Sequence, residues 1–155
     1  MNLPKTQTGD SCVIARHHWR VGVVGYCPPS QFDENEARRM INEAYDKVVV
    51  YSGPAPVAIV SGLTNVGVLA IAYEEAVKRG WRTVGVACKR AMEHQLFPVD
   101  EQLVVGDNWG DESSAFIGIL DAMIRIGTGK QSIRETDEVR AKRLPTFEYD
   151  LPVLD

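Results

Sequence analysis

The sequence predicts an α/β domain, a three-layer sandwich in which a mainly parallel sheet carries helices on both faces. Short apolar runs with few charges, typical of buried parallel strands, alternate with longer segments whose apolar residues recur at helical spacing. Such alternation is typical of strand-helix-strand units with right-handed crossovers. At 155 residues the chain has the size of one domain, and 45% hydrophobic residues are enough for a substantial core.

The first half of the chain predicts two strands, each followed by a helix. The first strand is expected at residues 20–25, an apolar run that ends in a glycine. A loop with two prolines follows, and Asp33 can then cap the first helix. The end of this helix stays open, because residues 48–51 fit either its continuation or a short strand. The second strand is expected at residues 57–60, and a helix at residues 68–77 ends at basic residues before a glycine.

The second half continues the alternation. The remaining strands are expected at residues 81–88, 103–106, 122–126 and 146–149, and the remaining helices at residues 111–123 and 132–143. Asp111 is the expected N-cap of the third helix. Prolines flank the final strand, so it is expected at an edge of the sheet. Residues 1–12 are polar, and we expect residues 1–19 to form an N-terminal arm and residues 20–155 the single domain.

Residues 127–135, between the fifth strand and the last helix, form the first candidate ligand loop. Glycines let the backbone approach a ligand closely, and the N–H groups at the helix start attract phosphate or carboxylate. Lys130 adds a charge and Ser132 a hydroxyl. The ligand-binding residues expected here are Gly127, Thr128, Gly129, Lys130, Gln131 and Ser132. The alternative is an ordinary turn capped by Ser132.

Residues 61–67, after the second strand, form a second loop of the same kind. Its short polar side chains and glycines suit a sharp turn beside a ligand. The ligand-binding residues expected here are Ser61, Gly62, Thr64, Asn65 and Gly67, with Gly25 and Tyr26 after the first strand. The alternative is that the polar residues only cap the next helix. The spacing is not the GxGxxG of dinucleotide sites. In a parallel sheet all three loops lie at one edge, where they can converge on one ligand.

Composition excludes several classes of function. The net charge of -4 and the pI of about 5.4 provide no basic surface for nucleic acid or an anionic membrane. Three separated cysteines indicate neither a disulfide framework nor a metal site. Four carboxylates, in Asp107, Asp111, Glu112 and Glu135, have no spacing that requires a cation, so no metal is predicted. No stretch approaches the roughly 20 apolar residues of a membrane span, and a cytoplasmic location is expected.

The two glycine loops together resemble a Rossmann-like superfamily. It holds the LONELY GUY (LOG) phosphoribohydrolases, the "lysine decarboxylase"-like proteins and the molybdenum-cofactor carrier proteins. In that superfamily the first loop is typically SGG with a further glycine, and the second is GGGxGTxxE. The matching residues are Ser61, Gly62 and Gly67 in the first loop, and Gly127, Gly129, Ser132 (in place of Thr) and Glu135 in the second. Leu63 stands at a glycine position, as do Thr128 and Gln131.

The resemblance implies a Rossmann-like three-layer sandwich, at least a homodimer, and a nucleotide-like ligand held by its phosphate and sugar, with no required cofactor. LOG hydrolases pair the motif glutamate with an arginine on the preceding helix, where this chain has no basic residue. We therefore expect binding, sensing or carrying of a nucleotide or a nucleotide-derived phosphorylated ligand. The alternative is hydrolysis of the N-glycosidic bond of nucleoside 5′-monophosphates, with Glu135 and Glu112 as catalytic residues. Asp111 and Glu112 otherwise begin an ordinary helix.

Overall fold

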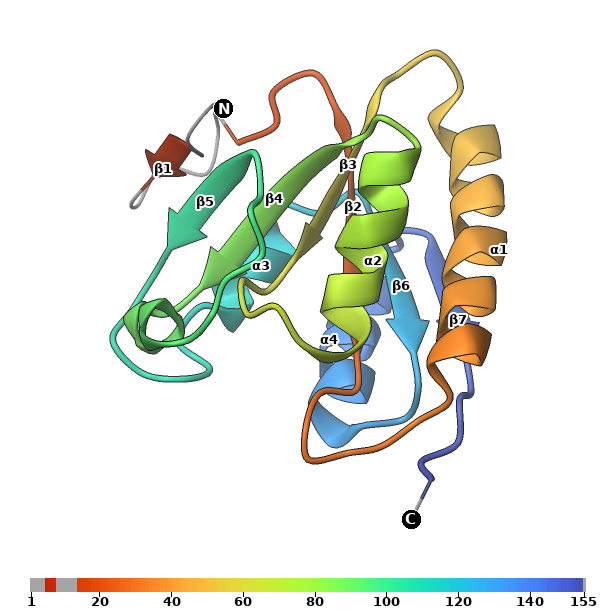
Figure 1. Ribbon diagram of the computed structural model, residues 1–155. Helices are drawn as coiled ribbons and strands as arrows, with labels where there is room; N and C mark the ends of the chain where they lie inside the picture. Colours follow the sequence, from red (N-terminus) through yellow and green to blue (C-terminus); the bar gives the residue numbers. More distant parts are fainter. Residues whose placement is uncertain (1–4, 8–13, 155) are drawn as a thin grey trace.

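The computed structural model describes residues 5–7 and 14–154. Within them, seven strands form one sheet in the order β1-β5-β4-β3-β2-β6-β7, and every neighbouring pair is parallel (Figure 1). The strands are β1 Lys5–Gln7, β2 Trp19–Gly25, β3 Val57–Ser61, β4 Arg82–Ala87, β5 Glu101–Val104, β6 Ala122–Ile126 and β7 Thr146–Tyr149. The predicted class, a sandwich built on a mainly parallel sheet, is confirmed, and β7 lies at an edge as expected.

Helices cover both faces of this sheet (Figure 1). The helices are α1 Glu34–Ser52, α2 Gly67–Lys78, α3 Ser113–Gly118 and α4 Lys130–Ala141, with a short 3-10 helix, η2 Lys89–Glu93, after β4. The core layer under α1 and α2 includes the fully buried Tyr45 and Tyr73. The layer under α3 and α4 includes Phe116 and Val139. Within the described ranges, no helix combines the length and the apolar character of a membrane span.

Strand β2 marks the point where the winding of the sheet reverses. It lies between β3 and β6. From β2 the chain moves outward through β3, β4 and β5, and then returns to the other side of β2 with β6 and β7. Ligands of open parallel sheets bind at such a reversal, beyond the carboxyl ends of the strands. The last paired residues of the two central strands, Gly25 and Ile126, lie at this point.

The structure resolves one open helix boundary and corrects another. The open question at residues 48–51 is resolved as helix, because α1 continues to Ser52 with Val48 buried against the sheet. The expected helix at residues 111–123 is wrong in length, since α3 spans only Ser113–Gly118. Asp111 is not its N-cap. Its carboxylate instead accepts hydrogen bonds from the amides of Asp107 and Asn108 and holds the turn before the helix.

The expected strand at residues 103–106 is also displaced. β5 begins at Glu101, whose buried carboxylate accepts a hydrogen bond of 2.7 Å from Arg82 and another of 3.0 Å from the amide of Ala15. These bonds compensate the charge of Glu101, so the strand begins before the apolar run at residues 103–106 that predicted it. Gly106 lies outside the strand, with a φ of +79°.

Part of the expected arm contributes to the sheet and the core. Strand β1 pairs with β5, and Ile14 is fully buried in the core layer of α3 and α4. The remainder of the stretch up to residue 13 lies outside the described residues.

Replacing Gly67 by alanine is expected to destabilise the fold more than replacing Gly80. Both glycines have positive φ angles, +64° and +73°. A Cβ at Gly67 would lie 2.3 Å from the carbonyl oxygen of Tyr26, whereas nothing lies within 4 Å of one at Gly80. Gly80→Ala should lower the free energy of unfolding by about 1 kcal/mol, the backbone cost alone, and Gly67→Ala by about 3 kcal/mol. Urea unfolding measures both. Equal losses would contradict the close approach of α2 to the loop after β2.

Candidate functional site

A cavity of about 470 Å³ lies beyond the carboxyl ends of the central strands. The loops after β2, β3, β5 and β6 contribute to its wall. The predicted site residues that line it are Gly25, Tyr26, Ser61, Gly62, Thr64, Glu112, Gly129, Lys130, Gln131, Ser132 and Glu135. The structure thus brings the three predicted loops to one cavity. The four other predicted residues, Asn65, Gly67, Gly127 and Thr128, are not among its lining residues.

The first turn of α4 faces this cavity. Gly129 is the N-cap residue and no side chain caps the helix, so Ser132 does not act as the cap that the alternative required. The first hydrogen bond of the helix runs from the amide of Ile133 to the carbonyl of Gly129. The amides of residues 130–132 precede that bond, and the first amides of a helix have no partner within it. Because residues 130–132 line the cavity, the positive end of the helix dipole lies at the cavity wall.

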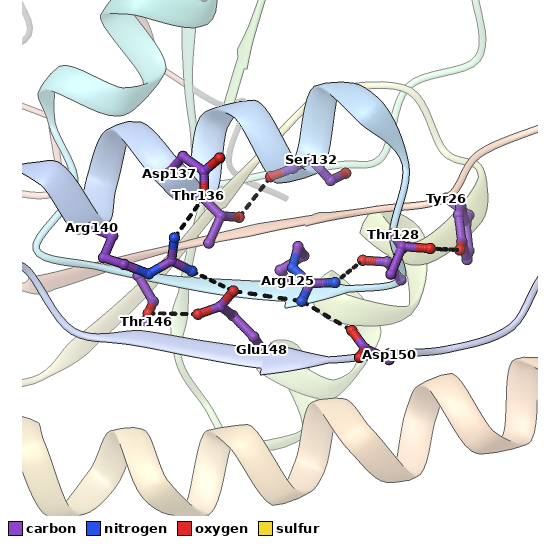
Figure 2. A network of polar contacts seen from close by, with 11 residues as sticks. Tyr26, Arg125, Thr128, Ser132, Thr136, Asp137, Arg140, Thr146, Glu148 and Asp150 are labelled. Atoms are coloured by element: carbon purple, nitrogen blue, oxygen red, sulfur yellow. Dashed lines mark hydrogen bonds and ion pairs between the residues drawn. The ribbon is translucent and has the colours of Figure 1, made fainter.

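Tyr26 joins the loop after β2 to the loop after β6. Its hydroxyl accepts a hydrogen bond of 2.9 Å from the amide of Thr128 and lies 3.0 Å from the Thr128 hydroxyl (Figure 2). Its ring covers Gly127, where a Cβ would lie 2.4 Å from a ring carbon and where φ is +98°. Gly127 and Thr128 therefore support the loop, and Gly129 leaves room at the cavity, since a Cβ there would meet nothing closer than 3.9 Å.

A buried arginine on β6 holds the same loop from behind. Arg125 is 8% exposed, and its guanidinium donates to the carbonyl of Gly127 and, at 3.0 Å, to Asp150. It also lies 3.5 Å from Glu148 on β7 (Figure 2). Arg140 of α4 forms an ion pair with Glu148, and this hydrogen bond is the main reason that the pKa of Glu148 is lowered. Arg125 was not among the site residues predicted from the sequence. The available signal was a basic residue inside an otherwise apolar strand.

The second predicted loop forms a wall of the cavity. The Ser61 hydroxyl donates to the carbonyl of Val23 at 2.7 Å, and the Ser61 amide donates to the Tyr73 hydroxyl, so this serine connects β3 to β2 and to α2. The N-cap of α2 is Val66 and has no side-chain hydrogen bond, so the alternative that the polar residues cap this helix is wrong. The amide of Val68, near the start of α2, donates to the carbonyl of Tyr26 instead. The start of α2 therefore packs against the loop after β2.

Both candidate catalytic carboxylates line the cavity. Glu135 is 5% exposed and accepts a hydrogen bond of 2.8 Å from the Ser113 hydroxyl. Burial raises its pKa, the hydrogen bonds from Ser113 and Gln131 act in the opposite direction, and the charge of Glu112 adds a smaller upward effect. Glu112 itself accepts a hydrogen bond from the amide of Gly110. No group of three or more possible metal ligands occurs in the part of the chain that the structure describes.

Two aromatic residues of the cavity wall, Trp109 and Phe116, were also not among the predicted site residues. Phe116 belongs to α3. Trp109 lies in a loop rich in glycine and acidic residues, and an aromatic side chain in such a loop was the available signal.

Comparison with known proteins identifies the fold. No family model and no curated protein matches the sequence. The solved structure of the molybdenum cofactor carrier protein from Chlamydomonas reinhardtii matches with a TM-score of 0.65 and 20% identity, over 84% of this chain and 76% of its own. The molybdenum cofactor binding protein from the phototrophic bacterium Rippkaea orientalis matches with a TM-score of 0.66 and 19% identity, over 86% and 77%. The chain has the fold of the molybdenum cofactor carrier proteins. The resemblance found in the two glycine loops is confirmed at the level of the fold.

Glu135→Gln is expected to raise the melting temperature at pH 7 and to leave it unchanged near pH 4. Because the pKa of Glu135 is higher in the folded protein than in the unfolded chain, ionising this carboxyl disfavours the folded state. The penalty is absent below the unfolded pKa, about 4.3, and is complete once the pH exceeds the folded pKa. Glutamine does not ionise, so the substitution removes this destabilisation of the folded state. Calorimetry across this pH range tests the prediction, and a difference independent of pH would contradict it.

Proposed function

We propose that the protein binds and carries a phosphorylated, nucleotide-like small molecule in the cavity, with the phosphate at the start of α4. The observation that carries this proposal is the row of helix amides at residues 130–132 beside the cavity. A helix start with free amides and a favourable dipole is a site where proteins bind phosphate.

The charges around the cavity support an anionic ligand at that end. Lys130 is the one cation among the described residues that line it, and it has no ion pair with any described residue. Its ammonium group is therefore available to a ligand. Glu135 also lines this cavity, and burial raises the pKa of its carboxyl. A hydrogen bond from the Lys130 ammonium group to a phosphate oxygen would be charge-assisted, and such bonds are about twice as strong as neutral ones.

The solved structures of the same fold support a carrier or binding role. They are described as proteins that carry or bind the molybdenum cofactor. We extend this only to the ligand class, a phosphorylated nucleotide-like or nucleotide-derived compound. The homodimer and the cytoplasmic location stay predictions, and light scattering after gel filtration checks the first of them.

Lys130→Gln is expected to weaken the binding of AMP about tenfold or more, because it removes one charge-assisted hydrogen bond. Isothermal titration calorimetry measures the change. Lys47→Gln is the matched control, since Lys47 lies on α1, does not line the cavity and should leave binding unchanged. Equal affinities in the wild type and Lys130→Gln would contradict the placement of the phosphate.

Hydrolysis of a nucleoside 5′-monophosphate is the second candidate, and it is favoured by one observation. Glu135 is a buried carboxyl of raised pKa that lines the cavity near Glu112. Such a group can stabilise an oxocarbenium ion or position water. Incubation with a panel of nucleoside monophosphates separates the two functions. Release of a base that Glu135→Gln abolishes supports the hydrolase, whereas thermal stabilisation without turnover supports the carrier.

A further inference from the structure

Among the described residues, three aromatic side chains line the cavity, and one of them differs from the others in exposure. Tyr26 is 7% exposed and Phe116 is 6% exposed, whereas Trp109 is 53% exposed. The Tyr26 hydroxyl is also engaged with Thr128. Trp109 is therefore the aromatic ring of the cavity wall that is accessible to a ligand.

The turn that carries Trp109 is held in place by its own hydrogen bonds. One oxygen of Asp111 accepts from the amides of Asp107, at 3.1 Å, and Asn108, at 3.0 Å. The carboxylate of Glu112 accepts from the amide of Gly110, the residue after the tryptophan, at 3.0 Å. A preformed turn presents its side chain without the entropic cost of ordering a loop on binding.

The indole has one ring neighbour among the described residues, and that ring is inclined to it. His94 lies 5.7 Å from Trp109 between ring centroids, at an interplanar angle of 49°. An inclined imidazole on one side supports the indole but does not form a parallel stack with it. With half of its surface exposed, Trp109 retains a face that a planar ligand group can cover.

The turn also lies close to the phosphate end of the cavity. Ser113, at the start of α3, donates to Glu135 of α4 at 2.8 Å. Trp109 and Ser113 are four positions apart in the sequence, and a fully extended chain over that distance spans no more than about 14 Å. Trp109 and the first turn of α4 thus line the same cavity.

We propose that Trp109 is the stacking platform for a planar heteroaromatic ring of the ligand whose phosphate binds at the start of α4. The inference rests on the proposed function and assigns the residue that contacts the planar ring of its nucleotide-like ligand. Phosphorylated sugars without a ring system lack the group that Trp109 contacts. Stacking on an aromatic side chain accepts any planar base, so this residue selects for the presence of a ring.

AMP and ribose 5-phosphate are the probes that test this inference, because they share the sugar and phosphate and differ by the base. Titration calorimetry is done with the full chain as wild type, Trp109→Ala and Trp109→Phe. Trp109→Ala should weaken AMP binding by about 5-fold to 150-fold and leave ribose 5-phosphate binding unchanged. Trp109→Phe, which keeps a ring, should recover most of the AMP affinity. Tyr51→Ala is the control, since Tyr51 is an exposed aromatic residue outside the cavity.

Each other outcome has a separate meaning. If Trp109→Ala weakens both probes equally, the residue shapes the loop and the stacking role is overturned. If it weakens neither, the stacking role is overturned while the phosphate site stands. If the wild type binds neither AMP nor ribose 5-phosphate nor inorganic phosphate, the proposed function fails and this inference fails with it.

Discussion

The hydrogen bonds of the Tyr26 hydroxyl determine where the first turn of α4 lies, and the cavity depends on them. Strands β2 and β6 are paired up to Gly25 and Ile126, so Tyr26 is the first residue beyond the ladder on one strand. Its hydroxyl contacts Thr128, the second residue beyond the ladder on the other strand. The two loops at the sheet reversal are therefore fixed relative to each other before any ligand is present. This arrangement makes the amides at the start of α4 a preorganised site, and preorganisation reduces the entropic cost of binding.

Arg125 supports that site from within the protein. A buried guanidinium requires partners for its charge and its donors, since an unpaired buried charge strongly destabilises a fold. Here the partners are the carbonyl of Gly127 and the carboxylates of Glu148 and Asp150 (Figure 2). The amide of Gly127 also donates to the carbonyl of Tyr149 at 2.8 Å. The loop is thus attached to the strand after α4 as well as to the loop after β2, which links its position to two independent parts of the chain.

The architecture and the location of the cavity were predictable because they follow from periodicity and from the geometry of parallel sheets. Alternating strands and helices fix the edge at which the glycine loops meet, so residues such as Gly129 and Glu135 were placed correctly at one cavity. The roles of individual glycines were not predictable. Gly67 and Gly127 approach Tyr26, and a glycine that packs against protein has the same sequence signature as one that packs against a ligand.

The remaining differences come from long-range pairing. Strand β5 begins earlier than its apolar run because Arg82, distant in sequence, neutralises Glu101. Asp111 resembles a helix cap, but its carboxylate stabilises the turn at Trp109. No pattern within a short window contains these contacts. Arg125 and Trp109 each had a local signal, a basic residue in an apolar strand and an aromatic residue in a polar loop, but neither signal identifies the partners or the cavity that the side chain meets.

The most direct test of the account is the response of backbone amides to AMP in the ¹⁵N-labelled protein. If the phosphate binds at the start of α4, the amide resonances of residues 130–132 should shift more than any others on that side of the sheet, and in proportion to saturation. If those three amides stay unchanged while resonances elsewhere respond, for example at the start of α2, the central claim is contradicted.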